Sequence, residues 1–277
     1  MFVLYRIIPL AWNGVLSFQK WSPFKPAEWA GLFHYEEMLI YDDVFWKSLW
    51  NTIVFMSSSP LAIGLALGIA LLVNSPIRGR ALYRAAVFLS YPLMTVAVGI
   101  IWRWLYDEKV GLINYVLIWL GVIGKGIPFL ESADWAMPAV IVAAIWQIVG
   151  FFMIILLAGL QNIPQELHEA AAIDGASDRQ RFGRITLPLL RPSIFLCLII
   201  GIISSFTSFD LIYVMTRGGP NYSTELLITY IYRVAFSLSK LDYAAALTVV
   251  LFLFLLSLTW LANRLSGGEA GAVEATE

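Results

Sequence analysis

The chain has 277 residues, of which 60% are hydrophobic and 13% are charged, and its formal net charge is −1. Soluble domains are roughly half apolar and about a quarter charged. This composition, with a mean hydropathy of +0.77, therefore excludes a soluble protein and predicts an integral membrane protein. The nearly neutral charge and the lack of a basic tract in the sequence give no indication of nucleic-acid binding.

A helix needs about 20 mostly apolar residues to cross a lipid bilayer. We therefore expect an all-α membrane domain over residues 1–265, with six spans at about 1–18, 48–73, 85–106, 136–160, 194–215 and 244–263. The first span reaches only about 27 Å at ~1.5 Å per residue, slightly less than the hydrocarbon core. The sequence leaves open whether this span is truncated or the natural chain starts further upstream. Residues 111–121 are too short to cross, and residues 266–277 are expected to form a disordered cytoplasmic tail.

The distribution of arginine predicts the orientation, because short cytoplasmic loops are enriched in Lys and Arg. Two loops that fall on the same side in a six-span count are rich in arginine, namely Arg78, Arg80 and Arg84 in one and Arg179, Arg181, Arg184 and Arg191 in the other. The opposite loops carry lysines over longer stretches, among many carboxylates. The second arginine-rich loop and both termini are therefore expected in the cytoplasm.

That loop, residues 161–193, is the longest polar stretch between two apolar spans, and we call it the coupling segment. Pro164 stands where a helix can begin, and Gly175 stands where a left-handed helix end is favoured. Asp178 is expected to cap a second helix, which Pro188 and Pro192 would stop. The sequence thus predicts two short helices around a glycine turn, which form either a docking surface or a merely solvated amphipathic hairpin.

The same segment resembles the EAA signature of permease subunits from binding-protein-dependent ABC importers. The residues that carry the resemblance are Glu169, Ala170, Ala171, Asp174, Gly175, Ala176, Phe182, Ile185, Leu187 and Pro188. The resemblance implies that these residues contact an ATPase. It also implies a multi-pass protein of the bacterial cytoplasmic (inner) membrane whose partners are a second homologous permease subunit, two ABC ATPase subunits and an extracytoplasmic solute-binding protein.

The sequence contains no G-x-x-x-x-G-K-[ST] phosphate loop, no catalytic motif and no pattern of metal ligands. We therefore expect no enzyme activity, cofactor or metal on this chain, and we expect ATP and Mg²⁺ to be bound by the partner ATPase. The single cysteine, Cys197, lies in an apolar run and is expected to be a buried filler.

Residues within the predicted spans are candidates for a substrate path. Asp210 is the strongest, because a carboxylate inside a span usually faces a cavity or a partner group; it can instead reach interfacial water. Ser205, one of the hydroxyl residues near Asp210, is a further polar candidate. Gln147 is another, although a neutral amide can simply bond a neighbouring helix. Trp102, Phe209 and Tyr213 offer aromatic faces suited to sugars, or they pack against other helices.

Segments after the fifth predicted span resemble the carbohydrate-importing branch of the family. They are Thr216-Arg217-Gly218-Gly219-Pro220, Ser223-Thr224 and Tyr230-Ile231-Tyr232. Asp242-Tyr243-Ala244-Ala245-Ala246 resembles the family's entry to the last helix. Gly218, Gly219 and Pro220 predict a tight periplasmic turn. The resemblance implies ATP-driven import of a sugar, polyol or glycerol-phosphate compound.

The alternative is a secondary transporter driven by an ion gradient, which would predict ionisable residues near the middle of several spans, where only Asp210 is a candidate. The sequence leaves open the solute, whether this subunit contributes a substrate site, and whether the permease pairs with itself or with a homologue.

Overall fold

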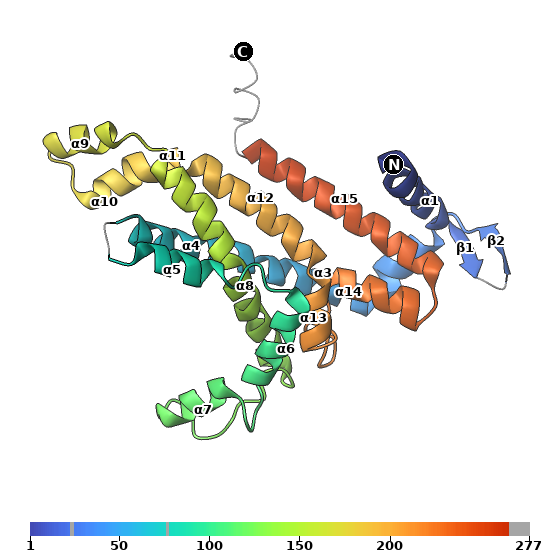
Figure 1. Cartoon of the computed structure of the whole chain (residues 1–277). Coiled ribbons are helices and arrows are strands. Elements are labelled where there is room, and N and C mark those ends of the chain that lie inside the picture. Colours follow the sequence, from blue (N-terminus) through green and yellow to red (C-terminus); the bar gives the residue numbers. More distant parts are fainter. Residues whose placement is uncertain (23–24, 76–77, 266–277) are drawn as a thin grey trace, which may run out of the picture. The chain divides into compact units, whose positions relative to one another are not determined.

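Helices account for nearly all of the secondary structure in the computed structural model, which describes residues 1–22, 25–75 and 78–265 (Figure 1). The prediction of a disordered tail at residues 266–277 lies outside the described residues. The chain folds as two compact units. Unit 1 comprises Met1–Phe55, Gly99–Val140 and Phe206–Glu277, and unit 2 comprises Met56–Val98 and Ile141–Ser205.

Most elements of unit 1 come from the two ends of the chain. They are η1 (Val3–Ile7), α1 (Ile8–Leu16), β1 (Gln19–Ser22), β2 (Lys25–Trp29), α2 (Phe33–Glu36), η2 (Glu37–Tyr41), α3 (Asp43–Met56), α7 (Leu112–Trp119), α13 (Phe209–Met215), α14 (Leu227–Tyr232), η4 (Arg233–Ser237) and α15 (Leu241–Leu265). Most of α6 (Thr95–Leu105) and the start of α8 (Ala133–Gln161) also belong to it.

The strands β1 and β2 form a hairpin that the sequence analysis did not predict. It is short and irregular, with a shift in register between Lys20 and Ser22, and Pro26 within β2 obscures the strand pattern. The Phe18 and Trp29 rings stack at its base, with centroids 5.8 Å apart. The preceding helix α1 packs on α15, where the Asn13 amide donates to the Ala245 carbonyl over 3.3 Å.

Asp42 joins three helices within unit 1. Its Oδ1 accepts the Phe45 backbone N–H over 2.9 Å at the start of α3. Its Oδ2 accepts the hydroxyl of Tyr230 from α14 over 2.6 Å and the hydroxyl of Tyr243 from α15 over 2.5 Å. Because each bond involves an anionic acceptor, this arrangement is stronger than three neutral hydrogen bonds.

Unit 2 contains the coupling segment and a core of apolar helices. Its elements are α4 (Ser58–Asn74), α5 (Arg80–Phe88), the rest of α8, α9 (Gln165–Ile173), α10 (Asp178–Arg181), η3 (Phe182–Thr186), α11 (Leu187–Leu189) and nearly all of α12 (Arg191–Thr207). Small side chains let these helices approach closely, as membrane helices commonly do. A Cβ at Gly150 would lie 2.3 Å from the Val87 carbonyl oxygen, and one at Gly201 would lie 2.6 Å from Ser59.

The core of unit 2 is built from α4, α8, α12 and the bend before α12. Its fully buried members include Ala62, Ala66, Ala70, Phe152, Met153, Leu156, Leu190 and Cys197. The prediction that Cys197 is a buried apolar filler is therefore confirmed.

Three helices in the described residues are long and apolar enough to cross a membrane: Asp43–Asn74, Ala133–Gln161 and Leu241–Ala262. They contain the predicted spans 48–73 and 136–160 and nearly all of 244–263. The predicted first span is a helix over Val3–Leu16, which is apolar but shorter. Residues 111–121 form only the short helix α7, as expected. The six-span count stays a prediction.

Two predicted spans are not continuous helices, and here the sequence analysis was wrong. Residues 85–106 are interrupted between Phe88 and Thr95, because Pro92 lacks an N–H and disfavours helix at the residue before it. Residues 194–215 are interrupted at Ser208, where ψ is 56°. Several hydroxyl side chains precede this break, and such side chains compete for backbone hydrogen bonds.

Candidate functional site

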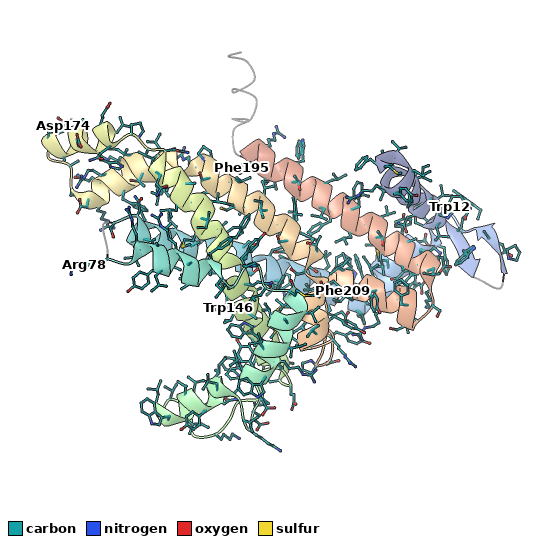
Figure 2. The ribbon with its side chains drawn as sticks, in the orientation of Figure 1. Trp12, Arg78, Trp146, Asp174, Phe195 and Phe209 are labelled. Carbon is teal, nitrogen blue, oxygen red and sulfur yellow. The ribbon has the colours of Figure 1, made fainter. Side chains whose placement is uncertain are left out.

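The first helix of the coupling segment ends in the glycine turn that the sequence predicts. Gly175 has a φ of +77°. Its N–H donates to the Ala172 carbonyl over 3.1 Å, and the Ala176 N–H donates to the Ala171 carbonyl over 2.9 Å. This pair of bonds is the Schellman pattern, which satisfies the carbonyls that the helix end leaves free. Helices α9 and α10 lie on either side of the turn, with Asp174 at its tip (Figures 1 and 2).

The second helix begins one residue earlier than predicted, because Ser177 and not Asp178 is its cap. The Ser177 hydroxyl accepts the Gln180 N–H, and the Gln180 side chain accepts the Ser177 N–H over 2.8 Å, which forms a capping box. Asp178 instead pairs with Arg181. Pro188 does not stop the helix either, since helical structure continues to Leu189 and then bends by 60° into α12.

The residues of the EAA signature lie on an accessible face of unit 2. Glu169, Ala170, Asp174, Gly175 and Leu187 are exposed, and Ala171, Ala176, Phe182, Ile185 and Pro188 are half-buried. The Glu169 carboxylate is held by the Gln165 amide, which donates to it over 2.9 Å.

Ile173, which the sequence analysis did not single out, is 87% exposed at the end of α9. A single exposed apolar side chain is ordinary at a protein surface, so what distinguishes Ile173 is its place beside the glycine turn. Its position directly before Asp174-Gly175 was the signal that could have identified it.

Two predicted path residues are bonded within unit 2. The Gln147 amide donates to the Leu93 carbonyl over 3.3 Å and to the Thr95 hydroxyl over 3.2 Å. Ser205 is buried and donates to the Gly201 carbonyl over 2.9 Å, with the Ser59 hydroxyl 3.3 Å away. Both side chains therefore join neighbouring segments, and for Gln147 this is the alternative that the sequence left open.

The other predicted path residues lie in unit 1. The rings of Phe209 and Tyr213 stack with centroids 5.1 Å apart, and the Tyr232 ring lies 4.9 Å from Phe209. Asp210 is exposed in the first turn of α13. Trp102 lies 5.3 Å from Tyr106, in a separate group of rings. The helices that carry the two groups are in contact at Gly99 and Val214. A Cβ added to Gly99 would lie only 2.9 Å from the Val214 side chain.

The predicted tight turn after α13 is a loop built around a buried carboxylate. Glu225 is 1% exposed, and it accepts from the Arg233 guanidinium. Gly218 has a φ of +83°, and a Cβ there would overlap Oε2 of Glu225 at 2.1 Å. Burial raises the pKa of the Glu225 carboxyl, against the opposing influence of Thr229 and Arg233. The glycine is therefore required for the position of the carboxylate.

Helix α3 fixes the same loop from the other side. The Asn51 amide donates to the carbonyls of Tyr222 and Glu225 over 2.8 and 3.0 Å. The Lys47 ammonium donates to the Asn221 carbonyl over 2.6 Å, and the Leu227 N–H donates to the Thr52 hydroxyl over 2.9 Å. These long-range bonds were not predictable from sequence spacing.

A pocket of about 550 Å³ opens beside this loop, and we call it the Arg217 pocket. Its lining is rich in tyrosine and arginine, and it comprises Val44, Tyr213, Arg217, Tyr222, Glu225, Thr229, Tyr230, Tyr232, Arg233, Ser237 and Leu238.

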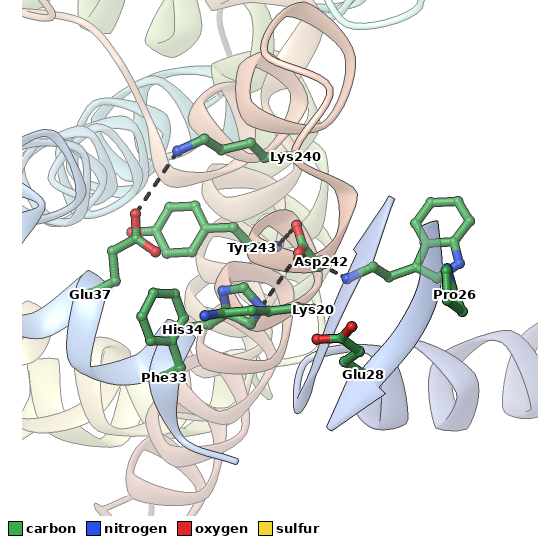
Figure 3. Close-up of a pocket in the computed structure, with 10 residues that line it drawn as sticks. Lys20, Pro26, Glu28, Phe33, His34, Glu37, Lys240, Asp242 and Tyr243 are labelled. Carbon is green, nitrogen blue, oxygen red and sulfur yellow. Dashed lines mark hydrogen bonds and ion pairs between the residues drawn. The ribbon is translucent and has the colours of Figure 1, made fainter. Parts of the chain in front are cut away.

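A second pocket, of about 440 Å³, lies between the hairpin, α2 and the start of α15, and we call it the His34 pocket (Figure 3). Nε2 of His34 lies 3.0 Å from the Gln19 carbonyl and 3.6 Å from Oδ2 of Asp242. Because a carbonyl only accepts, Nε2 carries a proton. The Lys20 ammonium lies 3.6 Å from the centre of the Phe33 ring.

No group of three or more His, Cys, Asp or Glu side chains that could hold a metal ion occurs in the described part of the chain.

A family model described as "Binding-protein-dependent transport system inner membrane component" matches residues 58–267. Sulfoquinovosyl glycerol transport system permease protein SmoG of Agrobacterium fabrum is 37% identical, over 91% of this chain and 81% of the relative. Trehalose/maltose transport system permease protein MalF of Thermococcus litoralis is 36% identical, over 94% of this chain and 86% of the relative.

Diacetylchitobiose uptake system permease protein NgcF of Streptomyces coelicolor is 33% identical, over 98% of this chain and 81% of the relative. Among solved structures, a bacterial ABC transporter involved in the import of the acidic polysaccharide alginate matches with a TM-score of 0.82 and 26% identity. That match covers 96% of this chain and 90% of the solved chain.

Proposed function

Because the chain belongs to the family of binding-protein-dependent transport system inner membrane components, we propose that it is the permease subunit through which an ATP-driven importer takes up a carbohydrate. The observation that carries the proposal is the match of residues 58–267 to the family, together with relatives named as permeases for sugars and sugar derivatives. The solute is a sugar, polyol or glycerol-phosphate compound.

The coupling segment is the element that receives motion from an ATPase. Its two helices are held at a fixed angle by the Schellman turn at Gly175 and by the capping box at Ser177. Helix α9 presents an acidic residue, Glu169, and an apolar one, Ile173, at the surface. A rigid surface with one charged and one apolar anchor supports docking to a partner rather than simple solvation.

The assembly contains a second permease, two ABC ATPase subunits and an extracytoplasmic solute-binding protein. ATP and Mg²⁺ bind to the ATPase subunits. A bacterial alginate ABC transporter of similar structure, 24% identical, was solved in complex with an alginate pentasaccharide-bound periplasmic protein. This complex supports the proposal that a solute-binding protein is a partner. The coupling segment and both termini lie in the cytoplasm, and the protein resides in the inner membrane.

Transport follows alternating access. ATP-driven closure of the ATPase subunits displaces the coupling segment, and its bend into α12 transmits the displacement to the apolar helices of unit 2. This scheme requires one element with two positions that both the nucleotide and the substrate bias.

The proposal is tested by measuring uptake with the partner ATPase removed and the ion gradients intact. The cognate binding protein is first titrated with a panel of carbohydrates, and the one that it binds is radiolabelled and used as the probe. We expect uptake to vanish without the ATPase and to survive an ionophore that collapses the gradients. The opposite pattern would establish the alternative, a secondary transporter.

A further inference from the structure

Resting on the proposed carbohydrate uptake, we propose that the Arg217 pocket binds a sugar that carries an acidic group, and that the Arg217 guanidinium pairs with that group. Carboxylate, sulfonate and phosphate substituents share the planar or forked acceptor geometry that arginine recognises.

The charge balance of the pocket points to an anion. Arg233 is already neutralised, because its guanidinium donates to the buried Glu225 carboxylate and, over 2.8 Å, to the Arg217 carbonyl. Arg217 has an exposed side chain that forms no ion pair within the described residues. One uncompensated positive charge therefore remains at the pocket.

The loop holds this charge in a fixed position. Arg217 and Tyr222 adopt left-handed φ values of 54° and 58°, which cost energy for residues other than glycine and cluster at functional sites. The Arg217 carbonyl is tied to Arg233, and the Tyr222 carbonyl is tied to Asn51 over 2.8 Å. A ligand that meets such a loop loses little free energy in ordering it.

The tyrosines supply the surface that a sugar ring needs. Tyr213 and Tyr232 meet edge to face with ring centroids 5.5 Å apart, and Tyr222 packs against the Arg233 guanidinium at 5.0 Å. Their three hydroxyls have no hydrogen-bond partner among residues 1–22, 25–75 and 78–265. Aromatic faces with free hydroxyls can contact the C–H face and the hydroxyls of a sugar. Tyr230 differs, because its hydroxyl is committed to Asp42.

Glu225 adds one buried group without a partner. Its Oε1 is buried and has no hydrogen bond in the described part of the chain. The nearby Thr229 hydroxyl lowers the pKa of this carboxyl, but it donates its proton to the Leu226 carbonyl over 2.9 Å. Buried unsatisfied groups are rare and usually have a functional or solvent partner, and a ligand hydroxyl would provide one here.

The test is a binding titration of the complete transporter in lipid nanodiscs with two probes, sodium D-glucuronate and D-glucose. We expect Arg217→Gln to weaken glucuronate binding about 10- to 100-fold, the range for losing a charged hydrogen bond, and to leave glucose binding unchanged. Arg217→Lys should retain part of the affinity, because the charge remains and the fork is lost. Lys240→Gln, which removes an exposed charge at the His34 pocket, is the matched control and should change neither affinity.

Glucuronate binding that is unaltered in Arg217→Gln, or reduced equally by Lys240→Gln, would overturn the inference. Unchanged glucose binding in Arg217→Gln also verifies that the variant is folded, and a loss of both ligands would count against a specific role for the charge. The proposed function is refuted by a different result, namely uptake that continues without the ATPase. The two failures are therefore distinguishable.

Discussion

Gly218 shows most directly how a single residue positions a charge in this protein. Replacement by Ala places a methyl group onto the Glu225 carboxylate and imposes a left-handed backbone on a residue with a Cβ. We expect Gly218→Ala to destabilise the chain by roughly 1–2 kcal/mol through strain and by up to about 3–5 kcal/mol more if the buried ion pair breaks. The measurement is the thermal unfolding midpoint of the detergent-solubilised protein.

Gly31 provides the matched control for that substitution. It has a similar φ of +58°, but a Cβ there would meet no atom within 4 Å. Gly31→Ala should therefore show the strain cost alone. Equal losses in the two variants would mean that the carboxylate moves aside and that Gly218 is needed only for its backbone conformation.

At the scale of the element, the coupling segment depends on its turn as well as on its surface. In Gly175→Val the new Cβ meets no atom within 4 Å. The substitution therefore destabilises only the left-handed backbone conformation of the turn, by about 1–2 kcal/mol. Glu169→Lys reverses an exposed charge without altering the turn. We expect both variants to abolish uptake while the protein still reaches the membrane, as measured by transport assay and by immunoblot of the membrane fraction.

Gly183→Ala is the control within the same segment, because Gly183 has no positive φ and open space around its Cβ. It should transport normally. Full uptake in Glu169→Lys and Gly175→Val, with normal ATPase coupling, would refute the role of this segment.

The sequence predicted elements whose signal is local and continuous. The apolar runs of α8 and α15 exceed the length of a bilayer crossing, and Gly175 marks a helix end by itself. The proline at position 92 indicates the break in the helix. Hydropathy averaged over a long window does not show this break, because the residues on both sides are apolar. The capping box was also readable, since Gln180 stands three residues after Ser177 and not after Asp178.

Some side-chain contacts follow from sequence spacing, and others join residues that are far apart in the sequence. The stack of Phe209 on Tyr213 follows from their separation by four residues on one helix. In contrast, the bonds from Asn51 and Thr52 to the loop at Tyr222–Leu227 join residues about 170 positions apart. The hydroxyl of Ser205 and the amide of Gln147 likewise have structural partners that could not be foreseen.

At the scale of the whole molecule, orientation in the membrane is directly testable. In a Cys197→Ala background, a single cysteine is introduced either at Ile173 or at Val122, both of which are exposed. Arginine-rich loops stay in the cytoplasm, so we expect a membrane-impermeant thiol reagent added to intact cells to label Val122→Cys and not Ile173→Cys. Labelling of both from the same side would contradict the predicted topology.

Asp42 has a mechanical consequence. One carboxylate joins α3, α14 and α15 through the Phe45 backbone N–H and the hydroxyls of Tyr230 and Tyr243. We therefore expect these three segments to move together during transport, with the hinge elsewhere along the chain.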